Sequence, residues 1–287
     1  MTADTTVRLP AGLLDAAGAC LQEADVRPVR GEDEEWLYAL PLTSLESEVV
    51  TGLLARCVSR IGPAAPTNGM VGQLPVGDRE WLILRLWRLT FGNRVELVLA
   101  CPRPACAARM DVDFALDALP VEERPQRPEY RFASHDGPDA IRLRFRLPRG
   151  ADLEALGRDC PEDTTEEELA ATLLGRCVLG TGDAAPALSS PQVREALAER
   201  LRAHSALVQR EFDVTCPACG REFSAGFDPI LAFLAEMMRR RPEFDRDVHL
   251  LSLYYHWPLS EILAMPRPRR RRYVRRLLDQ LEPAPAG

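Results

Sequence analysis

The sequence contains no lysine, so all 36 of its basic residues are arginines. A GC-rich genome favours arginine codons, and this explains the use of arginine in place of lysine without a functional reason. There is also no run of about 18 apolar residues, the length that a membrane-spanning helix needs, and no basic-then-apolar leader. From these absences we expect a cytoplasmic protein without a membrane span.

The motifs of common enzyme classes are missing as well. We find no G-x-S-x-G, no glycine-rich phosphate loop and no H-E-x-x-H, and there are only 4 histidines. His249 and His256 are spaced so that one helix face can carry both, but packed histidines explain this pair better than a catalytic or metal-binding pair. We therefore expect no enzymatic activity.

Net charge is −7, which disfavours a general nucleic-acid binder because phosphate neutralisation needs a basic face. The charges are nevertheless unevenly distributed. Residues 32–35 and 162–168 are acidic, whereas residues 239–241 and 267–276 are rich in arginine. At 287 residues the chain is long enough for one large domain or two smaller ones.

Four of the 8 cysteines form two pairs, Cys101-x4-Cys106 and Cys216-x2-Cys219. Each pair follows a short alternating run, so each is predicted to be a strand that enters a tight knuckle. Two knuckles supply four thiolates, which is the ligand set of a structural zinc site and leaves no open position for catalysis. A redox C-x-x-C, a structural disulfide and free thiols are the alternatives. The other four cysteines lie mostly in helical patterns, where a thiol acts as a small apolar side chain.

The predicted fold class is α+β, mainly helical, with short β-hairpins that form a zinc-ribbon-like core and a C-terminal helical subdomain. Residues 35–40 are predicted as a short strand, and residues 130–132 and 141–147 as a hairpin. Hydrophobic periodicity, cap residues and breaks predict the helices, with bounds near 43–61, 78–91, 165–178, 190–204, 230–238, 247–257, 259–266 and 269–281.

The chain also predicts an internal duplication. Residues 53–58 are similar to residues 173–178, and past the break that follows each of them the two cysteine pairs correspond at an offset of roughly 115 residues. Two related halves facing one another would close one zinc tetrahedron. This gives five expected parts, with bounds 1–42 (N-terminal extension), 43–120 (first half), 121–160 (inserted hairpin and linker), 161–229 (second half) and 230–287 (C-terminal helical region).

Several segments together resemble a known family. They are residues 78–82 through 90–92 to the first knuckle, residues 145–148 with 152–153, the second knuckle, and residues 249–251, 255–257, 261–263 and 269–273. In this order they resemble the baseplate protein family of contractile phage tails and of extracellular contractile injection systems. The resemblance covers most of residues 45–281, and the first knuckle is longer than the family's pattern. It implies a non-enzymatic structural or assembly role, with other baseplate, hub or spike proteins as partners.

The C-terminal helical region contains the expected partner-binding residues. Its last helix combines an apolar stripe with an arginine-rich flank, a pattern that suits a protein groove as well as phosphates. The residues that we expect to bind a partner are His256, Trp257, Arg269, Arg270, Arg271, Arg272 and Tyr273. The alternative function is a zinc-dependent nucleic-acid-binding protein that uses these arginines on phosphates.

Overall fold

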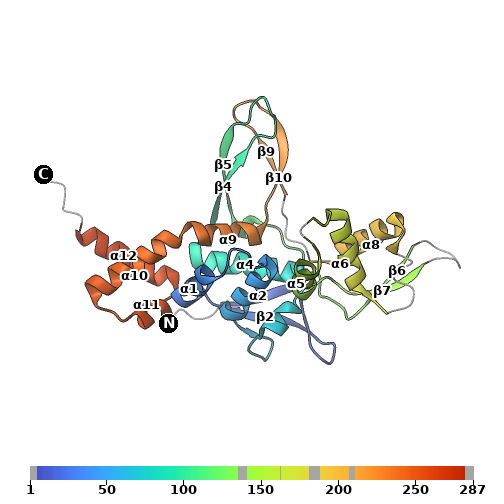
Figure 1. Ribbon diagram of the computed structural model, residues 1–287, viewed down its shortest axis with the longest axis horizontal. Coiled ribbons are helices and arrows are strands. Elements are labelled where there is room, and N and C mark those ends of the chain that lie inside the picture. Colours follow the sequence, from blue (N-terminus) through green and yellow to red (C-terminus); the bar gives the residue numbers. More distant parts are fainter. Residues whose placement is uncertain (1–4, 135–140, 162, 181–187, 207–210, 282–287) are drawn as a thin grey trace. The chain divides into compact units, whose positions relative to one another are not determined.

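The computed structural model describes residues 5–134, 141–161, 163–180, 188–206 and 211–281 (Figure 1). The chain divides into two units, each assembled from three segments. Unit 1 consists of Met1–Val26, Leu42–Leu82 and Val121–Val208. Unit 2 consists of Arg27–Pro41, Ile83–Pro120 and Gln209–Gly287. Because each unit combines segments that are far apart in the chain, this division does not test the five consecutive parts expected from the sequence. Those parts stay a prediction.

Unit 1 contains two small antiparallel sheets with helices. Its elements are β1 (Thr5–Leu14), β2 (Cys20–Val26), α2 (Glu46–Cys57), β3 (Val58–Ile61), α3 (Asn68–Gly72), the first residues of α4 (Val76–Phe91), β6 (Tyr130–Ala133), β7 (Arg142–Phe145), α5 (Gly150–Asp159), α6 (Glu166–Cys177), β8 (Val178–Leu179) and α8 (Pro191–His204). The strand orders are β1-β2-β3 and β6-β7-β8.

Strand alternation fixes which face of each sheet is buried. In β7 Leu143 and Phe145 are buried whereas Arg142 and Arg144 are exposed, as the alternating sequence predicts. The buried face packs on α6 and α8, whose contribution to this core includes Leu174. The hairpin of β6 and β7 is therefore confirmed, and its expected turn at 136–138 lies outside the described residues.

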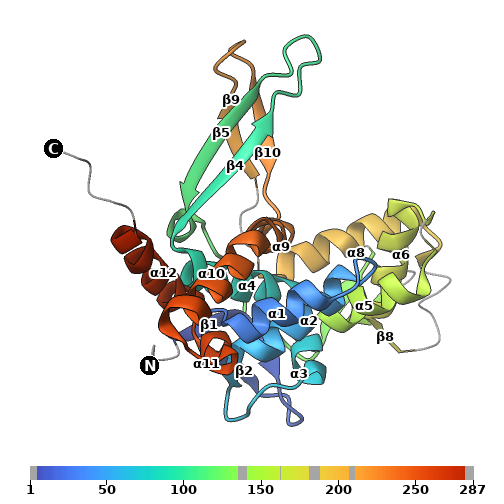
Figure 2. The ribbon, with the colours of Figure 1, turned by 60° about the vertical axis from the view of Figure 1, so that its left-hand side comes forward.

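Unit 2 contains two hairpins and a set of helices. Its elements are α1 (Gly31–Ala39), the remainder of α4, β4 (Arg94–Ala100), β5 (Arg109–Ala115), the 3-10 turn η1 (Leu116–Ala118), β9 (Glu211–Thr215), β10 (Glu222–Gly226), α9 (Pro229–Arg239), α10 (Arg241–Tyr255), α11 (Leu259–Ala264) and α12 (Arg267–Leu281). The β4–β5 and β9–β10 hairpins lie side by side (Figures 1 and 2).

Cap residues explain where several helices begin. The Thr165 hydroxyl accepts a hydrogen bond from the backbone N–H of Glu168, and the Glu168 carboxylate accepts one from the N–H of Thr165. This capping box satisfies two donors that a helix start leaves unpaired. Ser190 and Asp228 accept from backbone N–H groups in the same way at the starts of α8 and α9. The predicted start of α6 is thereby confirmed. The four predicted C-terminal helices are present, but α10 spans Arg241–Tyr255 instead of 247–257.

Two local predictions are wrong. Residues 35–40 are not a strand, because the chain is helical from Gly31 to Ala39 and buries Leu37 and Tyr38 on one side of α1. The helix expected over 43–61 ends at Cys57, since residues 58–61 form β3 and pair with β2. In both cases long-range packing decides between two patterns that a short apolar run cannot distinguish.

The pattern Arg-x-x-Arg-Gly-x-Asp occurs twice, at residues 27–33 and 146–152. In each copy the first arginine donates two hydrogen bonds to the aspartate carboxylate, at 2.6 and 3.1 Å in the first copy and 2.6 and 2.8 Å in the second. Each copy follows a hairpin and begins a helix, α1 or α5. The hairpin interpreted as an insertion therefore has a counterpart near the N-terminus, while duplication of whole halves stays a prediction.

Candidate metal centre

The two hairpins of unit 2 form the knuckles that carry the paired cysteines. In each knuckle the backbone N–H of the first cysteine donates to a carbonyl on the returning chain, that of Ala108 at 2.9 Å and that of Arg221 at 2.8 Å. The residue after the last cysteine is left-handed in both, with φ of 46° at Ala107 and 69° at Gly220. Glycine adopts this conformation without strain, so the shorter knuckle has the more favourable residue.

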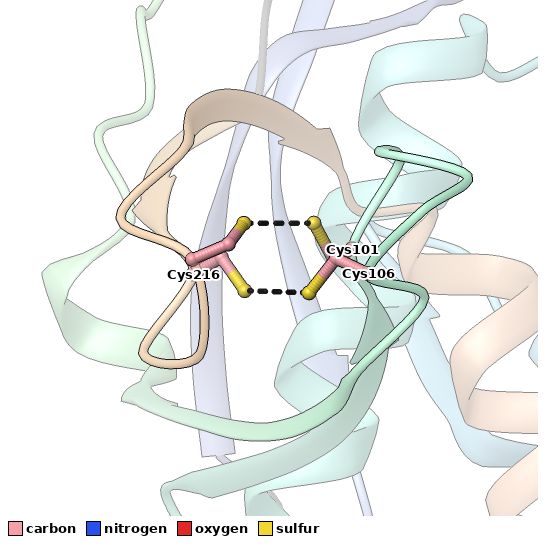
Figure 3. Close-up of side chains that lie close together, drawn as sticks. Cys101, Cys106 and Cys216 are labelled. Atoms are coloured by element: carbon pink, nitrogen blue, oxygen red, sulfur yellow. Dashed lines mark hydrogen bonds between the residues drawn. The ribbon is translucent and has the colours of Figure 1, made fainter.

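The four sulfur atoms meet between the knuckles (Figure 3). All lie within 4.8 Å of one another. The Sγ atoms of Cys101 and Cys219 are 3.7 Å apart, and those of Cys106 and Cys216 are 3.9 Å apart. A tetrahedral ion with metal–sulfur bonds of about 2.3 Å places its ligands about 3.8 Å from one another. The sequence-predicted ligands are thus brought together with spacing that suits one ion, and the four cysteines can hold a metal.

Apolar packing surrounds this cluster. Cys101 and Cys216 are buried, Cys106 and Cys219 are half-buried, and Met110 packs against them. All eight cysteines are free thiols, so the structural disulfide considered from the sequence is not formed. With four thiols at contact distance, loss of several protons would place like charges together unless a cation lies between them.

The thiols of the cluster differ in acidity. A hydrogen bond from the backbone N–H of Arg221 holds the pKa of Cys219 below its usual range, at about 7. At Cys101 the backbone N–H of Arg103 acts in the same direction, but burial and the neighbouring thiols outweigh it and raise the pKa to about 11. A metal ion would favour the thiolate at all four positions, and a four-thiolate site has no open position for a reacting water.

The other predicted site residues lie around the turn between α10 and α11. His256 is exposed and left-handed, with φ of 54°, which is uncommon for a residue with a side chain. Trp257 stacks on Tyr255 with ring centroids 4.9 Å apart and meets the edge of Tyr273 at 5.0 Å. The structure therefore brings His256, Trp257 and Tyr273 to one part of unit 2.

The arginine run divides between the surface and the interior. Arg269 and Arg272 are exposed, and their guanidinium carbons lie 5.9 and 5.7 Å from the centre of the Tyr273 ring. Arg270 is fully buried, and Arg271 donates to the Asp247 carboxylate at 2.7 Å. Two of the four arginines at 269–272 thus face carboxylates of the same chain.

Sequence reasoning missed the charge network that holds these helices. Glu34 of α1 is fully buried and pairs with Arg267 at 2.6 Å and with Arg270, whose other neighbour is Asp247 at 3.7 Å. No local pattern in the sequence indicates this network, because Glu34 and Arg270 are 236 positions apart.

Comparison with known proteins gives one match. The family described as T4 bacteriophage base plate protein matches residues 22–167, just over half of the chain. No curated protein and no solved structure matches. Within the described residues, the structure contains no helix that is both long and apolar enough to cross a membrane.

Proposed function

The chain belongs to the T4 bacteriophage base plate protein family, and on that premise we propose that it is a non-enzymatic structural or assembly protein of the baseplate in a contractile, phage-tail-like injection system. The family match over residues 22–167 carries the proposal. We further propose that the chain assembles in the cytoplasm with other baseplate, hub or spike proteins.

We propose zinc as the ion of the four-cysteine cluster. Thiolates are ligands that zinc prefers, and the Sγ separations of 3.7 and 3.9 Å suit its tetrahedral geometry. The four ligands come from residues about 110 positions apart in sequence, as Cys106 and Cys216 show. A bound ion would therefore connect the two hairpins, and its role would be structural.

Metal content tests the zinc assignment. Protein purified without added metal should contain about one zinc per chain by elemental analysis, and Cys216→Ser should release it and lower the melting temperature. Cys57→Ala and Cys177→Ala are controls. Both thiols are buried, but they belong to unit 1 and are not ligands of the cluster. Metal-free protein with an unchanged melting temperature would contradict the assignment.

We propose that a partner protein binds the aromatic–arginine surface, defined as Tyr255, His256, Trp257, Arg269, Arg272 and Tyr273. Aromatic and arginine side chains are enriched where binding energy concentrates in interfaces. Their neighbours Leu253, Tyr254 and Leu259 are about half exposed, at 52%, 47% and 50%. Such apolar exposure next to fixed aromatic rings is typical of a surface that another protein covers.

Assembly of the particle tests this surface. Trp257→Ala, and separately Arg269→Glu with Arg272→Glu, should prevent incorporation into baseplates seen by electron microscopy. Arg239→Glu with Arg276→Glu is the matched control, because it changes the net charge equally at exposed positions of the same unit. Full incorporation of the first two variants would contradict the proposal.

The nucleic-acid alternative has a different outcome. A binder that neutralises phosphates loses affinity steeply as salt rises, whereas an interface anchored by aromatic rings survives moderate salt. With Arg270 and Arg271 turned toward carboxylates, fewer arginines of the run remain for phosphates. Tight, sequence-dependent DNA binding by the wild type near physiological salt would replace the baseplate proposal.

A further inference from the structure

A second group of arginines in unit 2 surrounds a hollow of about 440 Å³. Arg267, Arg271 and Arg275 are four residues apart on α12, so they form one stripe along the helix. Arg88 near the end of α4 and Arg240 at the end of α9 complete the group. All charged side chains that line the hollow are arginines, and we call it the arginine pocket.

Two guanidinium groups of the arginine pocket are held in place before any ligand arrives. Those of Arg240 and Arg267 each lie 5.3 Å from the centre of the Phe91 ring, which also lines the pocket. Arg267 donates to Glu34 at 2.6 Å and to Glu243 at 2.8 Å. Side chains that are already fixed lose little conformational entropy when a ligand binds, so less of the interaction energy is offset by that cost.

We propose that the arginine pocket binds carboxylates of an acidic segment on a partner protein. A guanidinium presents paired donors that match a carboxylate, and five such groups converge on a lining that itself contains no carboxylate. Arg267 and Pro268 belong to the first turn of α12, a helix of 15 residues whose positive dipole end adds to the attraction.

The charges around the pocket favour a short acidic segment over a nucleic acid. Just outside the lining residues lie carboxylates that pair with the same arginines, among them Asp117 with Arg88 at 2.6 Å and Glu236 with Arg240. A long polyanion would meet these groups along its length and the field of a chain of net charge −7, whereas a short acidic segment would meet fewer of them.

The identity of the partner rests on the proposed baseplate function, but the binding itself does not. A synthetic peptide and the isolated chain suffice to measure it. Failure of peptide binding would therefore leave the baseplate proposal standing, and a failed assembly test would leave the arginine pocket standing.

The experiment titrates the full chain into fluorescein-labelled hexaglutamate and follows anisotropy at an ionic strength of about 0.15 M. Arg275→Ala and Arg88→Ala should each weaken binding about tenfold, since a hydrogen bond between charged groups contributes at least this factor. Arg276→Ala is the matched control, because it is exposed, adjacent on α12 and outside the lining. It should change affinity less than about twofold.

Several results would overturn the proposal. One is no increase in the anisotropy of the labelled hexaglutamate at protein concentrations up to about 1 mM, the limit of a weak contact. Another is an equal loss in Arg276→Ala, which would mean diffuse attraction to α12. A third is a single-stranded oligonucleotide of equal charge that binds more tightly than the peptide and loses affinity in Arg275→Ala, which would assign the pocket to nucleic acid. Circular dichroism of each variant verifies that the fold is retained.

Discussion

In each unit a buried arginine packs against the glycine of the Arg-x-x-Arg-Gly-x-Asp pattern. The arginine is Arg79 in unit 1 and Arg270 in unit 2. In unit 1 a side chain placed on Gly150 would overlap the guanidinium of Arg79, and in unit 2 one placed on Gly31 would approach that of Arg270 to 3.1 Å. Both arginines are almost fully buried. The two regions therefore use the absence of a Cβ in the same way, to let a guanidinium pack against a helix start.

The partners of the two arginines differ. Arg79 donates to the hydroxyl of Thr51 at 2.8 Å and to the carbonyl of Ser47 at 2.7 Å, with Glu154 farther away at 3.8 Å. Burial lowers the pKa of Arg79 to about 10 despite that carboxylate.

Arg270 instead contacts the fully buried carboxylates of Glu34 and Asp247. Removal of the guanidinium should therefore have different consequences at the two sites. At Arg79 it leaves mainly neutral acceptors without a donor, whereas at Arg270 it leaves buried carboxylates with less opposite charge.

Arg270→Met should have the largest effect on this comparison. Loss of the guanidinium leaves Glu34 and Asp247 buried with less compensation, and we expect the free energy of unfolding to fall by about 3–5 kcal/mol. Chemical denaturation measures the change. Arg272→Met is the control, because Arg272 is exposed on the same helix. A loss for Arg270→Met as small as for the control would show that the network contributes little.

Arg79→Met should cost less. The groups left behind are mainly the Thr51 hydroxyl and the Ser47 carbonyl. Because these acceptors are neutral, the free energy of unfolding should fall by about 1–3 kcal/mol relative to the wild type. Glu154 retains its hydrogen bond from Thr51, so it is not left alone. Denaturation of both arginine variants under one condition gives the comparison directly. A larger loss for Arg79→Met than for Arg270→Met would reverse it.

The cluster of cysteines was predictable because both signals are local. A C-x2-C or C-x4-C knuckle needs only a hairpin, and alternation in the flanking strands revealed the hairpins. The strand wrongly expected at 35–40 shows the limit of such local signals. Trp36, Leu37 and Tyr38 suit either state, and the contacts that select the helix are distant, such as the hydrogen bond from the Tyr38 hydroxyl to the carbonyl of Met237.

The interior charges were not predictable for a related reason. An arginine-rich helix with an apolar stripe indicates a solvated flank, yet Arg270 lies on the same buried side of α12 as Val274 and Leu277. A buried arginine needs partners for its charge and its donors, and for Arg270 one of these partners, Glu34, is 236 positions away in sequence. No periodicity in α12 alone contains that information.

Buried carboxyls extend the comparison to pH. Burial raises the pKa of Asp78 in unit 1 to about 7, although the backbone N–H groups of Ala11 and Gly12 donate to it. The folded state then keeps a proton that the unfolded state releases near pH 4, so the stabilisation is complete below about pH 4 and is lost as pH rises through about 7.

Asp78→Asn should remove this pH dependence. Between pH 5 and pH 8 the stability of the variant relative to wild type should rise, as measured by thermal unfolding in matched buffers. In unit 2 burial also raises the pKa of Asp247, against the opposing effect of Arg271 and Arg270, so Asp247→Asn should change in the same direction. A relative stability of Asp78→Asn that does not vary with pH would contradict the protonated carboxyl.

Helix caps give the smallest expected effect and test whether the two units open separately. Thr165 caps α6 in unit 1, and Asp228 caps α9 in unit 2 through hydrogen bonds of 2.9 and 3.0 Å. Thr165→Ala and Asp228→Ala should each destabilise by about 1 kcal/mol, because each helix start loses its side-chain cap. If the units open separately, Thr165→Ala should speed hydrogen exchange in α6 and its neighbours of unit 1, and Asp228→Ala should do so in unit 2 alone. Equal acceleration of exchange across both units in both variants would show instead that the chain unfolds as one cooperative body, and the differences between Arg79 and Arg270 would then appear in a single transition.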